Sequence, residues 1–245
     1  MNHFELEAYL NDLLQVPLFN DYAPNGIQIE GKPFIQKIAT AVTASLEVIQ
    51  KAIELEADAL LVHHGYFWKG ENSVIRGMKK TRIASLLLHE MNLFAYHLPL
   101  DAYESFGNNA SMGQRIGADV SEISNLLWFG DLKNDSAPSN FLKQLKMVYG
   151  PQVQAVITTE NPIQRIAWCT GAAQDYFEQA IAKGIDAFIT GEYSERSYHL
   201  AKESKVNFFA AGHHATEKDG IRFLGEHLSE KFSLNHYFID EDNPF

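Results

Sequence analysis

The order of apolar and polar positions predicts a strand, a helix and a second strand early in the chain. The short β-branched run Ile38–Val42 and the apolar run Ala59–Val62 are typical of buried strands. Between them, apolar residues recur three or four positions apart, which predicts one face of a helix, formed by Leu46, Ile49 and Ile53 with Ala52 able to join them. This segment is therefore predicted to be a βαβ unit.

The same pattern returns at Ile166–Glu192, which aligns without a gap with Ile38–His64. The two segments share seven identities, namely Ile38/Ile166, Ala39/Ala167, Ala44/Ala172, Ala52/Ala180, Ile53/Ile181, Asp58/Asp186 and Ala59/Ala187. The likeness resumes where Asn92–His97 aligns with Asn207–Gly212. Any two α/β segments share some apolar positions, but the matching lengths, ends and identities favour a duplication.

Helices between consecutive strands favour parallel pairing, because a parallel pair needs a crossover connection. We therefore expect an α/β fold of two similar, duplicated βαβ-type domains, with mostly parallel sheets flanked by helices. The polar stretch 130–140 carries turn formers and interrupts the periodic pattern, so it is the predicted boundary. The expected domains are residues 1–130 and 131–245, with the C-terminal helix and strand able to pack on the first half.

The composition is that of an ordinary globular protein, with 46% hydrophobic and 21% charged residues among 245. A formal net charge of −11 opposes general nucleic-acid binding, which depends on neutralising phosphates. No apolar run approaches the roughly 20 residues that span a bilayer, and the acidic N-terminus lacks the features of a secretory signal. The lone Cys169 has apolar neighbours, which predict a packed thiol. We therefore expect a cytoplasmic protein with no membrane partner.

Three predicted strands each end in a segment that carries histidine, and two of these segments add a carboxylate four residues later. These side chains are His63, His64, His97, Asp101, His213 and Glu217. Taken singly, each has a structural interpretation, since Asp101 can cap a helix and Glu217 suits the first turn of one. Together they lie at strand ends, where α/β sheets place their ligands. Imidazole and carboxylate groups suit zinc, iron, manganese or nickel without choosing among them.

A single catalytic metal usually takes three protein ligands and one water, which is fewer than this set provides. The number of donors suits two divalent metal ions bridged by a carboxylate, which would activate a shared water. The donors counted here are His63, His64, Asp101, His213 and Glu217, with His97 and His214 beside them in the same segments.

Four motifs in this order and spacing resemble one known family. They are DYAPNGIQIEG (Asp21–Gly31), VHHGYFWKGE, HLPLDA and GHHATE. The chain is similar over its whole length to the GTP cyclohydrolase 1 type 2 homologs, which are Nif-three-like dinuclear-metal proteins, and most similar to their short bacterial members. The sequence has no room for the extra central domain of the longer members.

The resemblance implies a metal site at five residues, with Glu217 as the bridge: His63, His64, Asp101, His213 and Glu217. His213 is preferred over His214 because the family has a His-x-x-x-Glu spacing. His97 matches a further family histidine, which is implied to support the ligands or to bind metal occasionally. The resemblance also implies two like α/β domains and a toroidal homohexamer.

A local basic cluster follows the first histidine pair and comprises Lys69, Arg76, Lys79, Lys80 and Arg82. Lys69 and Arg76 are hypothesised to hold the phosphates of a nucleotide, although a solvated approach to a helix explains the cluster equally well. The aromatic run Tyr66–Trp68 either stacks on a base or packs inside the protein.

The sequence contains no Walker loop, GxGxxG motif or serine nucleophile elbow, which favours metal-activated water as the nucleophile. We therefore predict a metal-dependent hydrolase that acts on a nucleotide-like small molecule, and the resemblance suggests cyclohydrolase action on GTP. The alternatives are a metal-dependent phosphoesterase and a non-enzymatic metal-binding or scaffold ring. The sequence does not assign a catalytic residue beyond the metal ligands.

Overall fold

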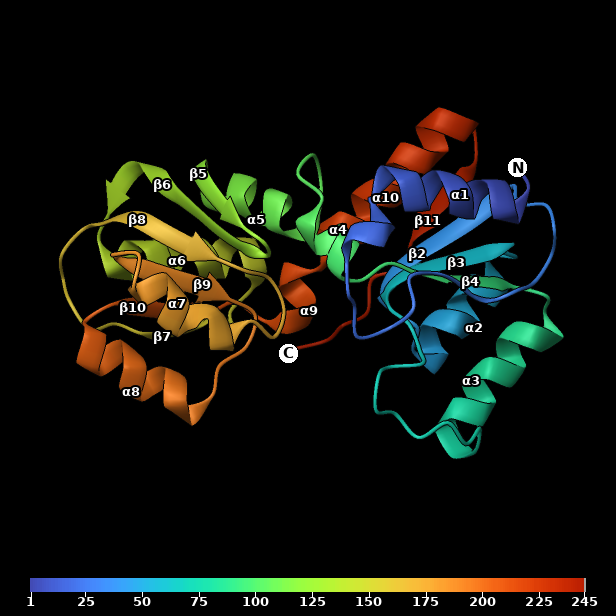
Figure 1. The fold of residues 1–245 in the computed structure, drawn as a ribbon, viewed down its shortest axis with the longest axis horizontal. Helices are drawn as coiled ribbons and strands as arrows, with labels where there is room; N and C mark the ends of the chain where they lie inside the picture. The colour runs from blue at the N-terminus through green and yellow to red at the C-terminus, as the bar shows by residue number, and fades with distance from the viewer. Residues whose placement is uncertain (245) are drawn as a thin grey trace. The chain divides into compact units, whose positions relative to one another are not determined.

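A computed structural model describes residues 1–244, and the contacts among them divide the chain into two units (Figure 1). Unit 1 consists of Met1–Tyr103 and Lys218–Glu241. Unit 2 consists of Glu104–Glu217 and residues 242–244. Within residues 1–244, no helix combines the length and the hydrophobicity that a membrane span requires.

Unit 1 contains a five-stranded sheet in the order β1-β4-β3-β2-β11. The strands in that order are Gly26–Ile29, Asn92–Ala95, Ala59–His64, Lys37–Thr43 and Asn235–Phe238. Strands β4, β3, β2 and β11 are parallel, and β1 runs antiparallel to β4 at one edge. The inner strand β3 is therefore covered by a neighbour on each side, and its residues from Ala59 to His63 are buried.

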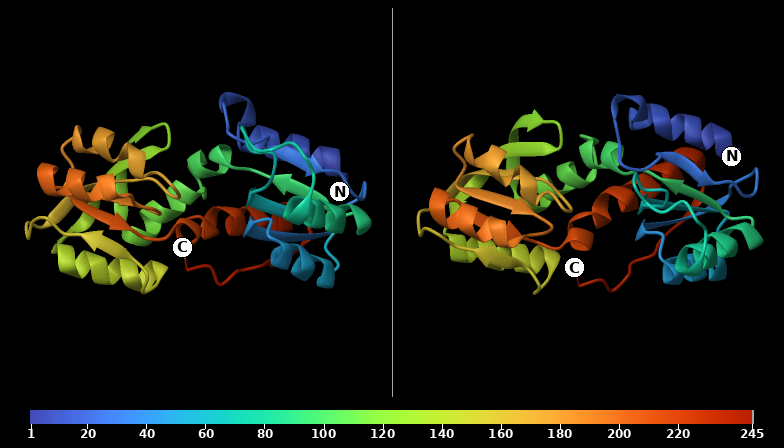
Figure 2. Two further views of the ribbon diagram at one scale, coloured as in Figure 1. Left: turned by 90° about the horizontal axis from the view of Figure 1, so that it is seen from below. Right: turned by 60° about the horizontal axis from the view of Figure 1, so that its bottom comes forward.

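Helices cover both faces of this sheet (Figures 1 and 2). One face carries α2 (Leu46–Glu54) and α3 (Gly77–Leu88), and the other carries α1 (His3–Leu13) and α10 (Lys218–Phe232). A 3-10 turn (Val16–Leu18) follows α1, and the short helix α4 (Leu98–Ala102) follows β4.

The face of α2 that packs on the sheet is rotated slightly from the predicted stripe. Val48, Ile49 and Ala52 are fully buried against the sheet, whereas Leu46 and Ile53 are only half-buried. The helix begins at Ser45, whose side chain accepts a hydrogen bond from the Val48 N–H. This cap fixes where the helix starts and so fixes which of its residues face inward.

Unit 2 contains a six-stranded sheet in the order β5-β6-β8-β9-β10-β7. The strands in that order are Ala118–Ser124, Leu127–Ser136, Ile163–Trp168, Ala187–Thr190, Asn207–Ala210 and Gln154–Val156. The central strands β8, β9 and β10 are parallel, and antiparallel strands extend the sheet on either side.

The helices of unit 2 also pack in two layers. Helices α5 (Asn108–Ile116) and α6 (Pro138–Tyr149) share one apolar cluster with the sheet, and α7 (Phe177–Ile181) and α8 (Glu195–Ser204) share another. A 3-10 turn (Gln174–Tyr176) precedes α7, and the one-turn helix α9 (His213–Thr216) follows β10. Cys169, directly after β8, is buried.

The two units repeat the same parallel register, which confirms the duplicated α/β fold. Ile38 pairs with Ala59 in unit 1, and the aligned residues Ile166 and Ala187 pair in unit 2. Ala59 pairs with Asn92, and Ala187 pairs with the residue aligned with Asn92, which is Asn207. The predicted alignment of the sequence is therefore an alignment of backbone positions.

Polar identities in the repeat are explained by hydrogen bonds to the main chain. The Asp58 carboxylate accepts from the N–H groups of residues 36 and 37, each at 3.0 Å. Asp186 accepts from the N–H groups of residues 164 and 165, at 3.0 and 2.8 Å. The Asn92 side chain accepts from the N–H of residue 31, two residues after β1, and the Asn207 side chain accepts from the N–H of residue 158, two residues after β7. Each side chain thereby satisfies main-chain donors that the sheet leaves unpaired.

The polar stretch 130–140 does not separate the units. It lies within β6 and the first turn of α6, and β6 pairs with β5 on one side and with β8 on the other. The outer half of β6 is exposed and its register shifts between Asp131 and Ser136, which accounts for its turn-like composition. The chain instead passes between the units after Tyr103 and after Glu217, so that α10 and β11 belong to unit 1.

Candidate metal centre

The end of β3 brings two imidazole rings together in unit 1. The His63 ring is buried, and its Nδ1 donates to the Tyr96 carbonyl at 2.9 Å. The His64 ring is half-buried, and its Nδ1 lies 3.2 Å from Thr43 Oγ1. The two ring centroids are 4.6 Å apart, although neighbours within a strand normally point to opposite faces. The strand ends at His64, so the chain turns there and the rings approach each other.

His97 is held at the end of β4 by two residues of the loop before β1. Its Nδ1 lies 2.7 Å from Asp21 Oδ1, and its backbone N–H donates to Asn25 Oδ1 at 2.8 Å. Burial raises the pKa of Asp21, but hydrogen bonds from His97 and Asn25 outweigh it and lower that pKa to about 2. Asp21 is therefore an anion at neutral pH, and it keeps a proton on Nδ1 of His97.

The ligand atoms of three histidines converge in unit 1. His63, His64 and His97 each offer one ligand atom, and these atoms lie within 4.8 Å of one another. The Asp101 carboxylate, from α4, adds an oxygen 3.5 Å from His63 Nε2. Three imidazole nitrogens and one buried carboxylate form a donor set that fits a borderline divalent metal.

Unit 2 carries a second group of donors, at the start of α9. His213 Nε2 lies 3.1 Å from Glu217 Oε2, and His213 Nδ1 lies 2.6 Å from Glu192 Oε1. Burial lowers the pKa of His213, but the carboxylates of Glu217 and Glu192 raise it more, to about 9. Without metal, the imidazole is therefore a cation between two carboxylates at neutral pH. His214, on the same short helix, is buried.

The loop after β8 approaches this pair through Gly171. Its backbone has φ +68, and a Cβ there would lie 2.1 Å from Glu217 Oε1 and 3.3 Å from His213 Nε2. The Gly171 N–H donates to Thr216 Oγ1 at 3.0 Å, which ties the loop to α9. Only glycine combines this left-handed backbone with so close an approach of a carboxylate.

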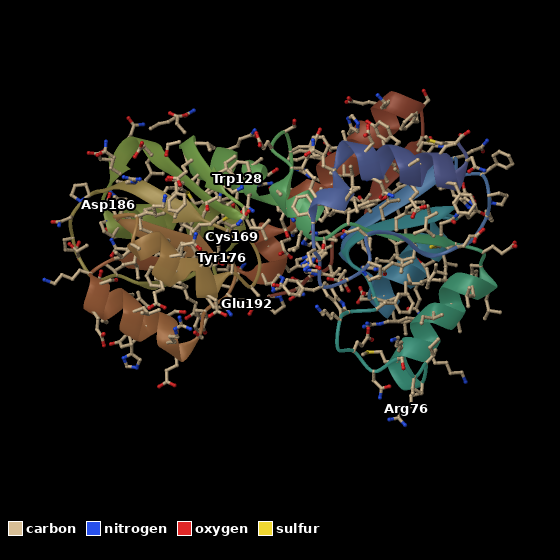
Figure 3. The ribbon with its side chains drawn as sticks, viewed as in Figure 1. Arg76, Trp128, Cys169, Tyr176, Asp186 and Glu192 are labelled. Carbon is tan, nitrogen blue, oxygen red and sulfur yellow. The ribbon has the colours of Figure 1, made fainter. Side chains whose placement is uncertain are left out.

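The predicted ligands thus fall into two groups. His63, His64, Asp101 and the neighbouring His97 belong to unit 1, whereas His213 and Glu217 belong to unit 2. Sequence reasoning did not select Asp21 or Glu192 as functional residues. Both had a signal in the sequence, because Asp21 lies in the DYAPNG motif and Glu192 aligns with His64 in the repeat. Figure 3 shows Glu192 at the edge of unit 2 opposite Asp186.

The basic cluster lies on the surface of unit 1. Lys69 and Arg76 are exposed, and Figure 3 shows Arg76 at the outer end of α3, pointing away from the unit. Lys79 is engaged within the cluster, with its Nζ 3.1 Å from Glu71 Oε1 and over the Phe67 ring. These positions are compatible with either interpretation of the cluster.

The aromatic residues Tyr66 and Trp68, which follow the histidine pair, have different positions. Tyr66 is buried and donates to the Ala44 carbonyl at 2.7 Å, so it is part of the core. Trp68 instead borders the histidines, with ring centroids 5.0 Å from His97 and 6.0 Å from His64. The indole therefore forms one wall beside the donor set of unit 1.

Comparison with known proteins matches residues 1–244 to the model of the Duf34/NIF3 (NGG1p interacting factor 3) family. A protein named GTP cyclohydrolase 1 type 2 homolog, from Yersinia pestis, is 48% identical over the full length of both chains. The solved structure of protein ybgI, described as of unknown function, is 46% identical with a TM-score of 0.98 over the full length of both chains. That of TTHA1606 from Thermus thermophilus is 30% identical with a TM-score of 0.91, again over both full lengths.

Proposed function

Because this chain belongs to the Duf34/NIF3 family, we propose that it is a dinuclear metal protein that hydrolyses a nucleotide-like substrate. The observation that carries this proposal is the gathering of three imidazoles and the Asp101 carboxylate at neighbouring strand ends. Imidazole and carboxylate groups are the ligands that borderline divalent metals take in proteins. The name of the Yersinia relative directs the choice of substrate towards GTP.

We assign two divalent metal ions, of zinc, iron, manganese or nickel, to five ligands: His63, His64, Asp101, His213 and Glu217. Glu217 is assigned the bridging position, and His97 supports the ligands or binds occasionally. When bound, such a metal pair lowers the pKa of water and polarises the bond under attack. The donor chemistry supports this assignment, because the set contains only imidazole and carboxylate groups.

The chain's own residues prepare these ligands for binding. Asp21 and the Tyr96 carbonyl accept from Nδ1 of His97 and His63, which favours the tautomer in which Nε2 carries the lone pair of each ring. Glu192 does the same for His213. Metal binding to His213 must displace the proton on Nε2, which the Glu217 carboxylate otherwise holds.

For GTP, the reaction consumes two waters. The first adds to the imidazole carbon of the purine and opens the ring, and the second releases that carbon as formate. Lys69 and Arg76 are assigned to the phosphates. We also propose a homohexamer in the cytoplasm, a state that light scattering tests as six times the 27.6 kDa chain mass.

Metal content measured by elemental analysis on chain purified without chelator or affinity tag tests the site. We expect two equivalents per chain, fewer in His63→Ala and Glu217→Ala, and no change in His89→Ala, which alters an exposed histidine. One equivalent or none in the wild type would refute a dinuclear site.

Formate release from GTP tests the activity, with Glu217→Gln as the inactive variant and Glu203→Gln, an exposed glutamate of α8, as the matched control. We expect release by the wild type and the control only. Metal-loaded wild type that cleaves phosphodiesters but not GTP would make the protein a phosphoesterase. Two tightly bound metals without turnover on any nucleotide would make it a non-enzymatic metal-binding protein.

A further inference from the structure

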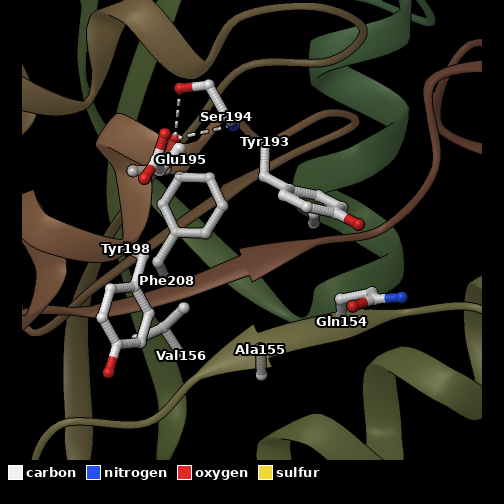
Figure 4. A pocket seen from close by; sticks show the side chains of 10 residues that line it. Gln154, Ala155, Val156, Tyr193, Ser194, Glu195, Tyr198 and Phe208 are labelled. Atoms are coloured by element: carbon white, nitrogen blue, oxygen red, sulfur yellow. Dashed lines mark hydrogen bonds between the residues drawn. The ribbon is translucent and has the colours of Figure 1, made fainter.

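A hollow of about 420 Å³ lies in unit 2, between the start of α8 and the strands β10 and β7 (Figure 4). The side chains that matter for its chemistry are Gln154, Val156, Tyr193, Glu195, Tyr198 and Phe208. Its volume falls in the range of small-molecule sites, about 300–1,000 Å³. None of these residues belongs to the predicted ligand set or to the basic cluster.

Aromatic rings dominate the hollow. Phe208 is only 1% exposed and belongs to the apolar cluster beneath α7 and α8, so it forms the floor. Tyr193 and Tyr198 are 58% and 50% exposed, and Figure 4 shows their rings on either side of Phe208 in that view. Tyrosine rings that are exposed beside an apolar floor offer faces for stacking with a planar group.

The aligned loop of unit 1 carries a buried tyrosine. Two residues after His64, Tyr66 is 7% exposed and packs into the core of that unit. Two residues after Glu192, which aligns with His64, the chain has Ser194 instead. Ser194 and Ser197 bond to each other in the capping box of α8. The two copies therefore differ here, with a core tyrosine in unit 1 and a capping serine in unit 2.

The polar side chains of the hollow include one carboxylate and one amide, from Glu195 and Gln154. Glu195 is exposed, so its carboxylate is open to a ligand. A carboxylate accepts hydrogen bonds from N–H donors, and the Gln154 amide both donates and accepts. A neutral planar ring with N–H donors on its edge satisfies these groups.

We propose that this hollow binds a planar, neutral heteroaromatic ring with N–H donors, of the nucleobase type. The ring stacks on Tyr193 and Tyr198 above Phe208, and its edge bonds to Glu195 and Gln154. This deepens the proposed function and rests on it, because it assigns the base of the nucleotide-like substrate to unit 2.

The place of the hollow in the fold supports this role. It adjoins the ends of β9 and β10, and α/β sheets bind ligands beyond the carboxyl ends of their strands. Tyr193 follows Glu192, which lies 2.6 Å from His213 Nδ1. The same loop therefore carries both a wall of the hollow and a support of a predicted metal ligand.

The test uses guanosine, which has the ring and its N–H donors but no phosphate, with the full chain in excess chelator. Binding is measured by ligand-observed NMR titration on the wild type, Tyr193→Ala, Tyr198→Ala and the space-filling Val156→Trp, since Val156 lines the hollow on the same side of the sheet as Phe208. Tyr237→Ala is the matched control, since this tyrosine is 44% exposed on β11 of unit 1. Circular dichroism establishes that each variant is folded.

We expect saturable binding that Tyr193→Ala and Tyr198→Ala each weaken about tenfold, which Val156→Trp abolishes and Tyr237→Ala leaves unchanged. No binding by the wild type, or equal binding by folded variants, overturns the proposal. So does a change of oligomeric state in the tyrosine variants without a change in guanosine binding, because the surface is then an interface between copies. Guanosine binding is measured without metal, so a failure to hydrolyse GTP does not affect its outcome. A failure to bind guanosine likewise does not decide whether the metal site hydrolyses GTP.

Discussion

Replacing Gly171 by alanine tests whether Glu217 and His213 are held where the structure places them. A Cβ at Gly171 would lie 2.1 Å from Glu217 Oε1, so the carboxylate must move. Gly184 provides a matched control, because its φ of +71 is nearly the same and a Cβ there meets nothing within 4 Å. The two substitutions share the backbone strain and differ only in the clash.

The expected magnitudes follow from these two contributions. An alanine with left-handed φ costs about 1 kcal/mol once the lower entropy of its unfolded chain is counted. Gly184→Ala should lose about that much unfolding free energy. Gly171→Ala should lose roughly 1–3 kcal/mol more, which is the usual cost of forcing an extra group into a packed site.

Urea unfolding in chelator, followed by tryptophan fluorescence, measures this difference. Trp128 and Trp168 are both buried in unit 2, and their ring centroids are 6.1 Å apart. Their emission therefore reports on the unit that contains Gly171. Metal content is the second measurement, and we expect it to fall in Gly171→Ala and to stay unchanged in Gly184→Ala. Equal unfolding free energies and equal metal contents for the two variants would refute the packing described for Glu217.

Three further predictions concern ionisable groups. The folded-state pKa of His213 is raised to about 9, so the stability that this residue adds is present below about pH 6.5 and is lost as the pH rises through 9. Urea unfolding in chelator should therefore give a lower free energy of unfolding at pH 9.5 than at pH 6. Glu192→Gln should make this difference smaller. Asp21→Asn should weaken metal binding about 10–100-fold by calorimetry, because it removes the anion that holds the Nδ1 proton of His97, which supports the ligands or binds occasionally. Asp58→Ala should cost about 2 kcal/mol in urea unfolding, because two main-chain N–H groups lose their acceptor, whereas the exposed Asp135→Ala should cost little; equal costs would contradict that account.

The sequence by itself determined the elements and their repetition. Strands and helices are set by the spacing of apolar residues, which is a local property, and the repeat carried that spacing twice. It also determined the register between strands, since Ala59 pairs with Asn92 and their counterparts Ala187 and Asn207 pair in the same way.

Tertiary structure alone decided how those residues are supported. Asp21 reaches His97 across 76 positions of the chain, and the Tyr96 carbonyl accepts from His63 across 33. Neither separation along the chain follows the periodicity of a helix or a strand, so neither contact could be recognised from one sequence. The hollow beside Tyr193 is likewise visible only after folding, because it depends on the short edge strand β7 lying beside β10.

The division into units was also decided by pairing between distant residues. Strand β11 joins β2 in the pair Asn235–Lys37, which assigns the C-terminal helix and strand to unit 1. The composition of 130–140 suggested a boundary because an exposed strand edge and a linker use the same polar residues. Sequence patterns record which side chains face water, whereas the partner of a strand is set by hydrogen bonds between segments far apart in the chain.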